Sequence, residues 1–315
     1  MSEYKFAIQA KHLNKTYNKK KSKKVKALID FNIEIPRGSI YGLLGPNGAG
    51  KTTIMEILEG YIQRTSGHVS VLGYDPDSSP EDLRSRVGIV LQETGVDLYL
   101  KVGEIIKQFS GFYQNPKPIN EILDVTGLRG QSDIRIRRLS GGQRRRLDVA
   151  LGIVGDPELL FLDEPTTGLD PYARRNTWNM IASLRELGKT ILLTTHYMDE
   201  AEVLADKIAL LNAGIIEAEG TLEELRTYKE ATTIRFQLDD ALNRMPVEIS
   251  ELANVIGNEV KLETTDPMSS LAILTSWALN EEIELRGLSV QQQSLDEIFI
   301  ELVEGRGTPG KVRLK

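Results

Sequence analysis

The 315-residue sequence has no cysteine and no apolar run long enough to cross a membrane. Without cysteine, neither disulfides nor thiolate metal sites can form, which fits a cytoplasmic chain. Apolar runs such as "ELLFLDEP" and "TILLTTH" fall far short of the roughly 20 residues that span a bilayer. The first ten residues also lack the apolar segment of a secretory signal. We therefore expect a soluble chain.

Positive charge is not in excess either, because 39 Lys and Arg residues face 45 Asp and Glu residues and the formal net charge is −6. This balance argues against a general nucleic-acid-binding protein, so no nucleic-acid partner is expected. The arginines between Arg135 and Arg146 are interpreted as surface charge on and before a helix. The run "KKKSKKVK", Lys19–Lys26, is interpreted as a solvated hairpin, with contact to anionic lipid headgroups as the alternative.

Glycine is concentrated in the stretch "GLLGPNGAGKTT", residues 42–53, which includes the end of an expected strand at Ile40–Leu44. The spacing fits G-x-x-x-x-G-K-[ST], the phosphate-binding P-loop, and an expected helix follows at Lys51–Glu59. Glycines let successive backbone N–H groups converge on phosphate oxygens, and a helix N-terminus favours an anion. The candidate nucleotide-binding residues are Gly45, Pro46, Asn47, Gly48, Ala49, Gly50, Lys51, Thr52 and Thr53.

A P-loop requires a carboxylate for the metal ion and a group that activates water, and the segment Glu158–Pro165 supplies both. An apolar strand ends there at Asp163, which would hold Mg²⁺ together with the Thr52 hydroxyl. Glu164 follows directly, placed to orient or deprotonate the attacking water. Lys51 would reach the β- and γ-phosphates. The sequence therefore predicts an enzyme that hydrolyses a nucleoside triphosphate with Mg²⁺.

A third motif, Leu139-Ser140-Gly141-Gly142-Gln143, stands between the P-loop and the acidic strand. In this order the three motifs resemble those of the ATP-binding cassette (ABC) ATPases, whose signature is LSGGQ, and the resemblance covers about residues 4–228. It implies that ATP is the nucleotide. It also implies that Ser140 to Gln143 of one chain meet the γ-phosphate bound by a second ATP-binding subunit. A homodimer enclosing two Mg-ATP molecules is therefore expected.

The resemblance extends to four single residues. Tyr17 matches the aromatic residue that stacks on adenine, and Gln92 matches the glutamine that joins Mg²⁺ and water sensing to the membrane-facing helical region. Asp170 matches the aspartate that links the two active sites of the dimer, and locally it is also typical of a helix N-cap. His196 matches the histidine that contacts the γ-phosphate and holds the catalytic groups. Arg145 departs from the glutamine often found at its position, so the resemblance implies no contacts for it.

The expected fold class is α/β: a P-loop NTPase of the ABC ATPase type with an antiparallel β layer and a helical subdomain, plus a small C-terminal α/β domain. Strands up to Pro36 form the antiparallel layer, and buried strands alternating with helices such as Pro171–Leu187 predict a mostly parallel sheet. The expected ranges are 1–228 for the ATP-binding domain, about 93–150 for its helical subdomain, 229–305 for the accessory domain and 306–315 for a flexible tail.

The resemblance implies a transport ATPase at the cytoplasmic face of the membrane, peripherally bound to a separate transmembrane permease. The segment Ser294–Val303 is similar to the end of daunorubicin-resistance-type exporter subunits, which favours export. An importer subunit is one alternative, and an ABC ATPase that acts on ribosomes or DNA is another. The sequence disfavours the last, because it has a single P-loop and a single signature, and only 89 positions separate Lys51 from Ser140. The accessory domain is expected to pack or dimerise, with regulation or coupling to substrate as the alternative.

Overall fold

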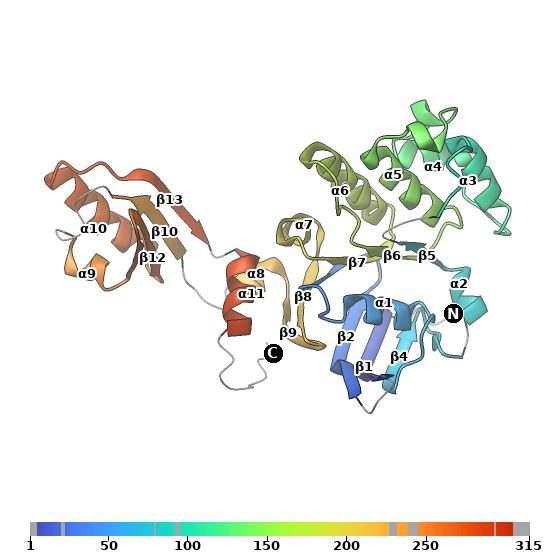
Figure 1. Cartoon of the computed structure of the whole chain (residues 1–315), viewed down its shortest axis with the longest axis horizontal. Coiled ribbons are helices and arrows are strands. Elements are labelled where there is room, and N and C mark those ends of the chain that lie inside the picture. The colour runs from blue at the N-terminus through green and yellow to red at the C-terminus, as the bar shows by residue number, and fades with distance from the viewer. Residues whose placement is uncertain are drawn as a thin grey trace. The chain divides into compact units, whose positions relative to one another are not determined.

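The computed structural model describes residues 5–19, 23–78, 80–91, 95–226, 232–238, 245–292 and 294–304 (Figure 1). It divides into two compact units, Met1–Leu222 and Glu223–Pro309. Gln92 and the expected tail at 306–315 lie outside the described residues.

A six-stranded sheet organises the first unit. All of its neighbouring strands are parallel except the last pair, as the sequence predicts. In spatial order the strands are β5 (Val87–Val90), β6 (Leu159–Asp163), β7 (Thr190–Thr195), β3 (Ile40–Leu44), β8 (Lys207–Asn212) and β9 (Ile215–Gly220). Strands β3 and β7 are buried along their whole length, since a parallel sheet is covered on both faces.

Successive side chains of the central strands point into two different hydrophobic cores. Leu159 and Phe161 of β6 belong to a core shared with helix α1 (Lys51–Leu58), whereas Leu160 and Leu162 belong to one shared with α5 (Gly141–Gly152) and α6 (Pro171–Glu186). In Figure 1, α1 and α6 accordingly lie on opposite sides of the sheet. The polar ends of β3, β6 and β7 all reach the same edge, because parallel strands run in one direction.

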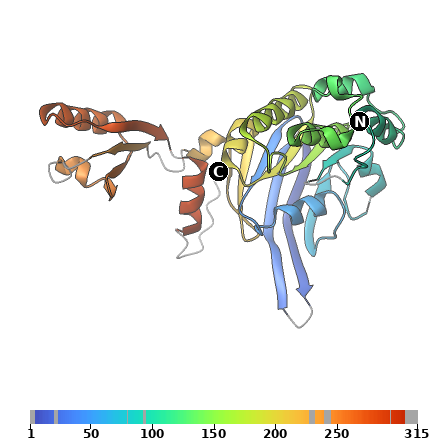
Figure 2. The same cartoon turned by 45° about the horizontal axis from the view of Figure 1, so that its top comes forward.

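A second, antiparallel sheet lies next to α1, with β1 (Phe6–Lys19) between β2 (Lys23–Pro36) and β4 (Ser66–Val71). Strands β1 and β2 pair out to Lys19 and Lys23, and Figure 2 shows this strand pair extending away from the rest of the first unit. Lys24 and Lys26 are exposed, in agreement with a solvated hairpin.

One turn connects the two sheets to the P-loop. Between β8 and β9, Ala213 and Gly214 adopt positive φ angles of 46° and 81°, which the tight turn of a hairpin requires. The Gly214 N–H donates to the Ala49 carbonyl of the P-loop at 2.8 Å, and the Gly214 carbonyl accepts from the Ile29 N–H of β2 at 2.9 Å. A Cβ at Gly214 would lie 2.4 Å from the Ala27 carbonyl oxygen, so only glycine fits.

The helical insertion expected between β5 and β6 consists of α3 (Val102–Ser110), α4 (Ile119–Val125) and α5. Val102, Ile105 and Ile106 of α3 are buried in the core that the insertion shares with β6 and β7. Three shorter helices complete the first unit and its C-terminal boundary: α2 (Pro80–Arg84), α7 (Met198–Leu204) and α8 (Leu222–Arg226).

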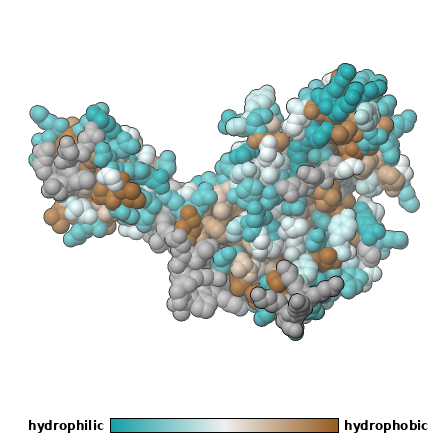
Figure 3. All heavy atoms as spheres, viewed as in Figure 1, coloured by the Kyte–Doolittle hydropathy of each residue, from teal (hydrophilic) through white to brown (hydrophobic). Residues whose placement is uncertain are grey.

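The second unit has its own four-stranded antiparallel sheet, in the order β11 (Ala253–Ile256), β12 (Glu259–Thr264), β10 (Thr232–Gln237) and β13 (Arg286–Gln292). Its helices are α9 (Val247–Ser250), α10 (Pro267–Asn280) and α11 (Leu295–Glu304). Ile234, Phe236 and Leu262 pack with Leu274 of α10 in a core of their own. Helix α10 has no charged residue, and Figure 3 shows apolar patches interrupting the polar surface of both units.

No helix within the described ranges combines the length and the apolar character that a membrane span needs.

Gly88 of β5 provides a test of the packing between the sheet and α5. A Cβ at this position would lie 2.1 Å from the Gly152 carbonyl oxygen, so neighbouring backbone would have to move. We expect Gly88→Ala to lower the free energy of unfolding by about 3 kcal/mol in urea titrations. Gly130→Ala is the matched control, because a Cβ there meets no atom within 4 Å. Equal stability of the two variants would contradict the packing described here.

Candidate active site

The P-loop follows β3 and leads directly into α1. Gly48 and Gly50 have φ angles of 83° and 112°, and Gly50 occupies the N-cap position of α1. A Cβ at Gly45 would lie 2.2 Å from the Leu211 carbonyl oxygen, whereas a Cβ at Gly48 would meet no atom within 4 Å. The loop is therefore packed against β8 on one side and open on the other. This open, glycine-lined side beside a helix N-terminus fits a phosphate group.

The side chain of Lys51 folds back toward the P-loop residues that precede it. Its ammonium group donates to the carbonyl oxygens of Gly45 at 2.6 Å and Pro46 at 3.3 Å, and its side chain is 6% exposed. Burial lowers the pKa of Lys51, against the opposing influence of Glu164 and Asp163. A desolvated ammonium group beside the backbone of a glycine-rich loop suits an anionic ligand.

The two acidic residues at the end of β6 are held by the neighbouring strand. Asp163 lies opposite Thr194 of β7, whose hydroxyl donates to the Asp163 carboxylate at 2.5 Å. The Glu164 N–H donates to the Thr194 carbonyl at 3.1 Å. Glu164 has a φ of 45°, a left-handed conformation that non-glycine residues rarely adopt and that costs on the order of 1 kcal/mol.

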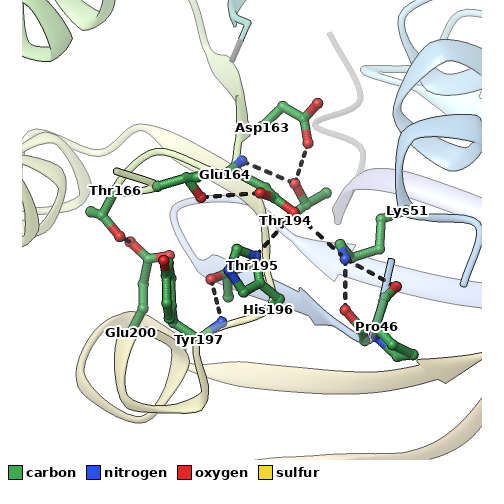
Figure 4. A network of polar contacts seen from close by, with 12 residues as sticks. Pro46, Lys51, Asp163, Glu164, Thr166, Thr194, Thr195, His196, Tyr197 and Glu200 are labelled. Carbon is green, nitrogen blue, oxygen red and sulfur yellow. Dashed lines mark hydrogen bonds and ion pairs between the residues drawn. The ribbon is translucent and has the colours of Figure 1, made fainter. Parts of the chain in front are cut away.

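The Glu164 carboxylate lies among several donors, as Figure 4 shows. Its Oε1 atom is 3.7 Å from Lys51 Nζ and 3.2 Å from His196 Nδ1, and its Oε2 atom accepts from the Thr167 hydroxyl at 3.0 Å. Burial raises the pKa of Glu164, but the contacts with His196, Thr167 and Lys51 outweigh it, so the pKa lies below its ordinary value. The carboxylate is therefore ionised at neutral pH and can accept a proton or orient water.

His196 directly follows β7 and also contacts a neighbouring aromatic ring. Its ring lies 4.1 Å from the ring of Tyr197, centroid to centroid. The guanidinium group of Arg174, in α6, lies 4.2 Å above the Tyr197 ring, a cation–π contact. Arg174, Tyr197 and His196 thus form a row of contacting side chains that leads from α6 to the Glu164 carboxylate.

Glu200 is a second acidic residue near the site, and sequence analysis missed it. It is fully buried and accepts from the Thr166 hydroxyl at 2.8 Å and from Trp178 Nε1 at 3.1 Å. Burial raises the pKa of Glu200. These bonds connect the segment after Glu164 with α6 and α7. No local pattern reveals Glu200, because its partners Thr166 and Trp178 lie 34 and 22 positions away in the chain.

Tyr17 lies near the end of β1, where the hairpin passes the start of α1. Its hydroxyl is 3.4 Å from the Thr53 hydroxyl, and Lys15 Nζ lies 4.9 Å from its ring centroid. The structure therefore places Tyr17 beside the P-loop helix.

The signature segment caps α5. The Ser140 hydroxyl accepts from the Gln143 N–H, and the Gln143 side chain accepts from the Ser140 N–H, which forms a capping box. Both Ser140 and Gly141 are exposed. Asp170 caps α6 in the same way, since its carboxylate accepts from the Ala173 N–H at 2.9 Å, which confirms the N-cap interpretation. The first turns of α5 and α6 are close, because a Cβ at Gly142 would lie 2.7 Å from that of Ala173.

One arginine contradicts the interpretation of the Arg135–Arg146 cluster as surface charge. Arg135, Arg137 and Arg138 are exposed as expected. Arg145, however, is 7% exposed and donates to backbone carbonyls at the ends of β5 and β6. The prediction failed because charge patterning along a sequence does not show which side of a short polar helix faces inward.

Comparison with known proteins identifies the family. The sequence profile of the ABC transporter family matches residues 28–167, and that of an ABC transporter C-terminal domain matches residues 232–294. The daunorubicin/doxorubicin resistance ATP-binding protein DrrA of Streptomyces peucetius is 36% identical over 309 residues, 94% of this chain and 92% of that protein. The chain belongs to the ABC transporter ATPases.

Other relatives and structures agree with this assignment. The Nod factor export ATP-binding protein I of Neorhizobium galegae is 42% identical over 201 residues, covering 62% of this chain and 58% of that protein. The dimeric structure of MJ0796, a bacterial ABC transporter cassette, superposes with a TM-score of 0.61 at 26% identity, covering 68% of this chain and 98% of that one. The predicted family, P-loop NTPase fold and ATPase activity are thereby confirmed.

Glu59, at the end of α1, offers a pH-dependent test of the site. It is 7% exposed, and burial together with Asp163 and Glu56 raises its pKa to about 7. The folded protein therefore retains a proton that the unfolded chain releases between about pH 4.5 and 7, so stability falls as the pH rises through this range.

We expect Glu59→Gln to remove this loss. The free energy of unfolding of the variant relative to the native protein should rise by on the order of 3 kcal/mol between pH 4.5 and pH 8, measured by urea unfolding. Glu81→Gln is the control, since Glu81 is exposed. A native protein and a Glu59→Gln variant with the same pH dependence would show that Glu59 does not carry this proton.

Proposed function

We propose that this ABC ATPase pairs with a second copy of itself around two Mg-ATP molecules and powers export through a separate membrane permease. The observation that carries the proposal is the position of Glu164. Its backbone has a positive φ, and its ionised carboxylate lies 3.7 Å from Nζ of Lys51, the P-loop lysine, and 3.2 Å from Nδ1 of His196. Such a carboxylate is suited to accept a proton from water beside a phosphate group.

The residues around the P-loop fit the remaining parts of the substrate. Lys51 and the backbone N–H groups at the start of α1 would bind the β- and γ-phosphates, and Tyr17 would stack on the adenine ring. His196, supported by Tyr197, would contact the γ-phosphate. Lys51 begins α1, Tyr17 lies beside α1, and His196 follows β7, which ends at the same edge of the parallel sheet as β3.

The Thr52 hydroxyl and the Asp163 carboxylate, with Gln92, would hold Mg²⁺. These are oxygen ligands, the type that Mg²⁺ prefers, and Asp163 is oriented by the Thr194 hydroxyl. When bound, the ion would neutralise charge that develops on the transferred phosphoryl group.

The exposed signature segment supports a dimer. Ser140 and Gly141 lie exposed at the start of α5, so this helix N-terminus is accessible to a phosphate held by another chain. Asp170 begins the neighbouring helix and would contribute to the same interface. A γ-phosphate enclosed from both sides is shielded from water, and hydrolysis then releases the partner.

Export and membrane attachment are supported by the relatives, whose names describe drug resistance and Nod factor export. The helical insertion exposes Leu98, Tyr99 and Phe112, which offers an apolar surface for the permease. We place the protein peripherally at the cytoplasmic face of the membrane. We also propose the limits 1–228 for the ATP-binding domain and 229–305 for the accessory domain, which packs or dimerises.

Replacing the general base tests its role. Glu164→Gln keeps the size of the side chain but cannot accept a proton, so turnover should fall about 100-fold or more while ATP binding is retained. The ATP-bound dimer should accumulate, which size-exclusion chromatography with light scattering would detect. Glu81→Gln is the matched control, because Glu81 is an exposed residue of α2. Turnover of Glu164→Gln at the native rate would exclude Glu164 as the base.

Replacing the exposed signature serine tests the dimer. Ser140→Arg places a bulky cation where the partner's γ-phosphate would dock, so hydrolysis should be lost while nucleotide binding by the single chain persists. Ser85→Arg adds the same charge at an exposed serine of the loop after α2 and should retain activity. Nucleotide affinity can be measured by fluorescence titration with a labelled ATP analogue. Loss of that affinity in Ser140→Arg would show that Ser140 acts within its own chain.

A further inference from the structure

Arg145 is a buried arginine in the signature helix with no role in the site as described so far. Its Nε donates to the Pro165 carbonyl at 2.8 Å, and its two terminal nitrogens donate to the carbonyls of Asp163 at 2.8 Å and Leu91 at 2.5 Å. Asp148, one turn further along α5, lies 3.8 Å away and partly balances its charge. A buried cation of this kind is stable only because these acceptors surround it.

Two of these acceptors stand on either side of Glu164. Arg145 holds the carbonyl before it, on Asp163, and the carbonyl after it, on Pro165, while Thr194 holds the Glu164 N–H. Glu164 is the residue with the unfavourable positive φ of 45°. A left-handed conformation persists at a non-glycine residue only where its surroundings determine it on both sides.

The third acceptor connects another motif. Leu91 follows β5 and immediately precedes Gln92 in the sequence. Arg145 is also five residues after Ser140 on the same helix, an axial rise of about 7.5 Å. One rigid helix therefore has an exposed end at Ser140 and a buried arginine that contacts the backbone on both sides of the catalytic carboxylate.

We propose that Arg145 is a positioning residue that holds Glu164 in its catalytic conformation and couples that conformation to the position of the signature helix. The inference rests on the proposed function, since it assigns Glu164 as the base. A shift of the Ser140 end of α5 on closure of the dimer would move the guanidinium group, and with it the backbone on both sides of Glu164. Guanidinium suits this role because its planar group presents five N–H donors, whereas a glutamine amide presents two.

The test compares Arg145→Gln and Arg145→Lys with Arg146→Gln in steady-state ATPase assays on the full chain. Arg146 is the matched control, because it is the next residue on α5 and its guanidinium contacts the Gly127 carbonyl, away from the acidic segment. We expect Arg145→Gln to lower kcat about tenfold or more with KM for ATP changed less than about threefold. Arg145→Lys should be intermediate, and Arg146→Gln should be close to the native protein.

Hydrogen exchange provides a readout that does not depend on turnover. In Arg145→Lys, amides in a peptide covering 163–167 should exchange faster than in the native protein, because the Glu164 backbone is less restrained, whereas a peptide covering 232–237 in the second unit should not change. This measurement also decides the matter if Arg145→Gln fails to fold.

Two results would overturn the proposal. One is a kcat of Arg145→Gln equal to that of the native protein. If Arg145→Gln does not fold, the corresponding result is an Arg145→Lys variant whose kcat and whose hydrogen-exchange rate at 163–167 both equal those of the native protein. The other is a loss of activity that comes from a raised KM alone, which would place Arg145 in nucleotide binding. If Glu164→Gln is inactive and Arg145→Gln is fully active, only this inference fails. If Glu164→Gln is fully active, the proposed function fails first.

Discussion

Lys51 Nζ and Glu164 Oε1 carry opposite charges and lie 3.7 Å apart at one edge of the parallel sheet, and both side chains are largely buried. The groups around them determine this separation. Burying either charge is costly unless other groups satisfy it. The Gly45 and Pro46 carbonyls accept from the lysine, and Thr167 donates to the carboxylate, with His196 at 3.2 Å. Both ends of the pair are therefore solvated by the protein itself, which leaves the site arranged for an anion before any ligand enters.

The pairing of β6 with β7 explains how the acidic segment is oriented. Because Asp163 is opposite Thr194 in a parallel register, one threonine contacts both the carboxylate of Asp163, the candidate metal ligand, and the backbone of Glu164, the proposed general base. A shift of this register by one residue would turn Asp163 toward the other face of the sheet. Positioning thus depends on the buried apolar residues of the two strands, which determine the register, as much as on the polar residues.

The sequence predicted the parts of the site that depend on local spacing. The P-loop, the strand ending at Asp163 and the N-cap at Asp170 follow from patterns within a few residues, and the mostly parallel sheet follows from the alternation of strands with helices. Thr194, Glu200 and Arg145 could not be found in this way, because their partners lie 18 to 54 positions away in the chain. In the second unit, β11 and α9 each have only four residues, too few to show a period in the sequence.

The turn at Ala213 and Gly214 has a mechanical consequence. One glycine peptide bonds the phosphate loop through Ala49 and the antiparallel sheet through Ile29, and backbone packing leaves no room for a larger residue. The strand pair that bears Tyr17 and the loop that bears Lys51 are thereby joined through a single residue, so folding itself sets the spacing between these two backbone segments.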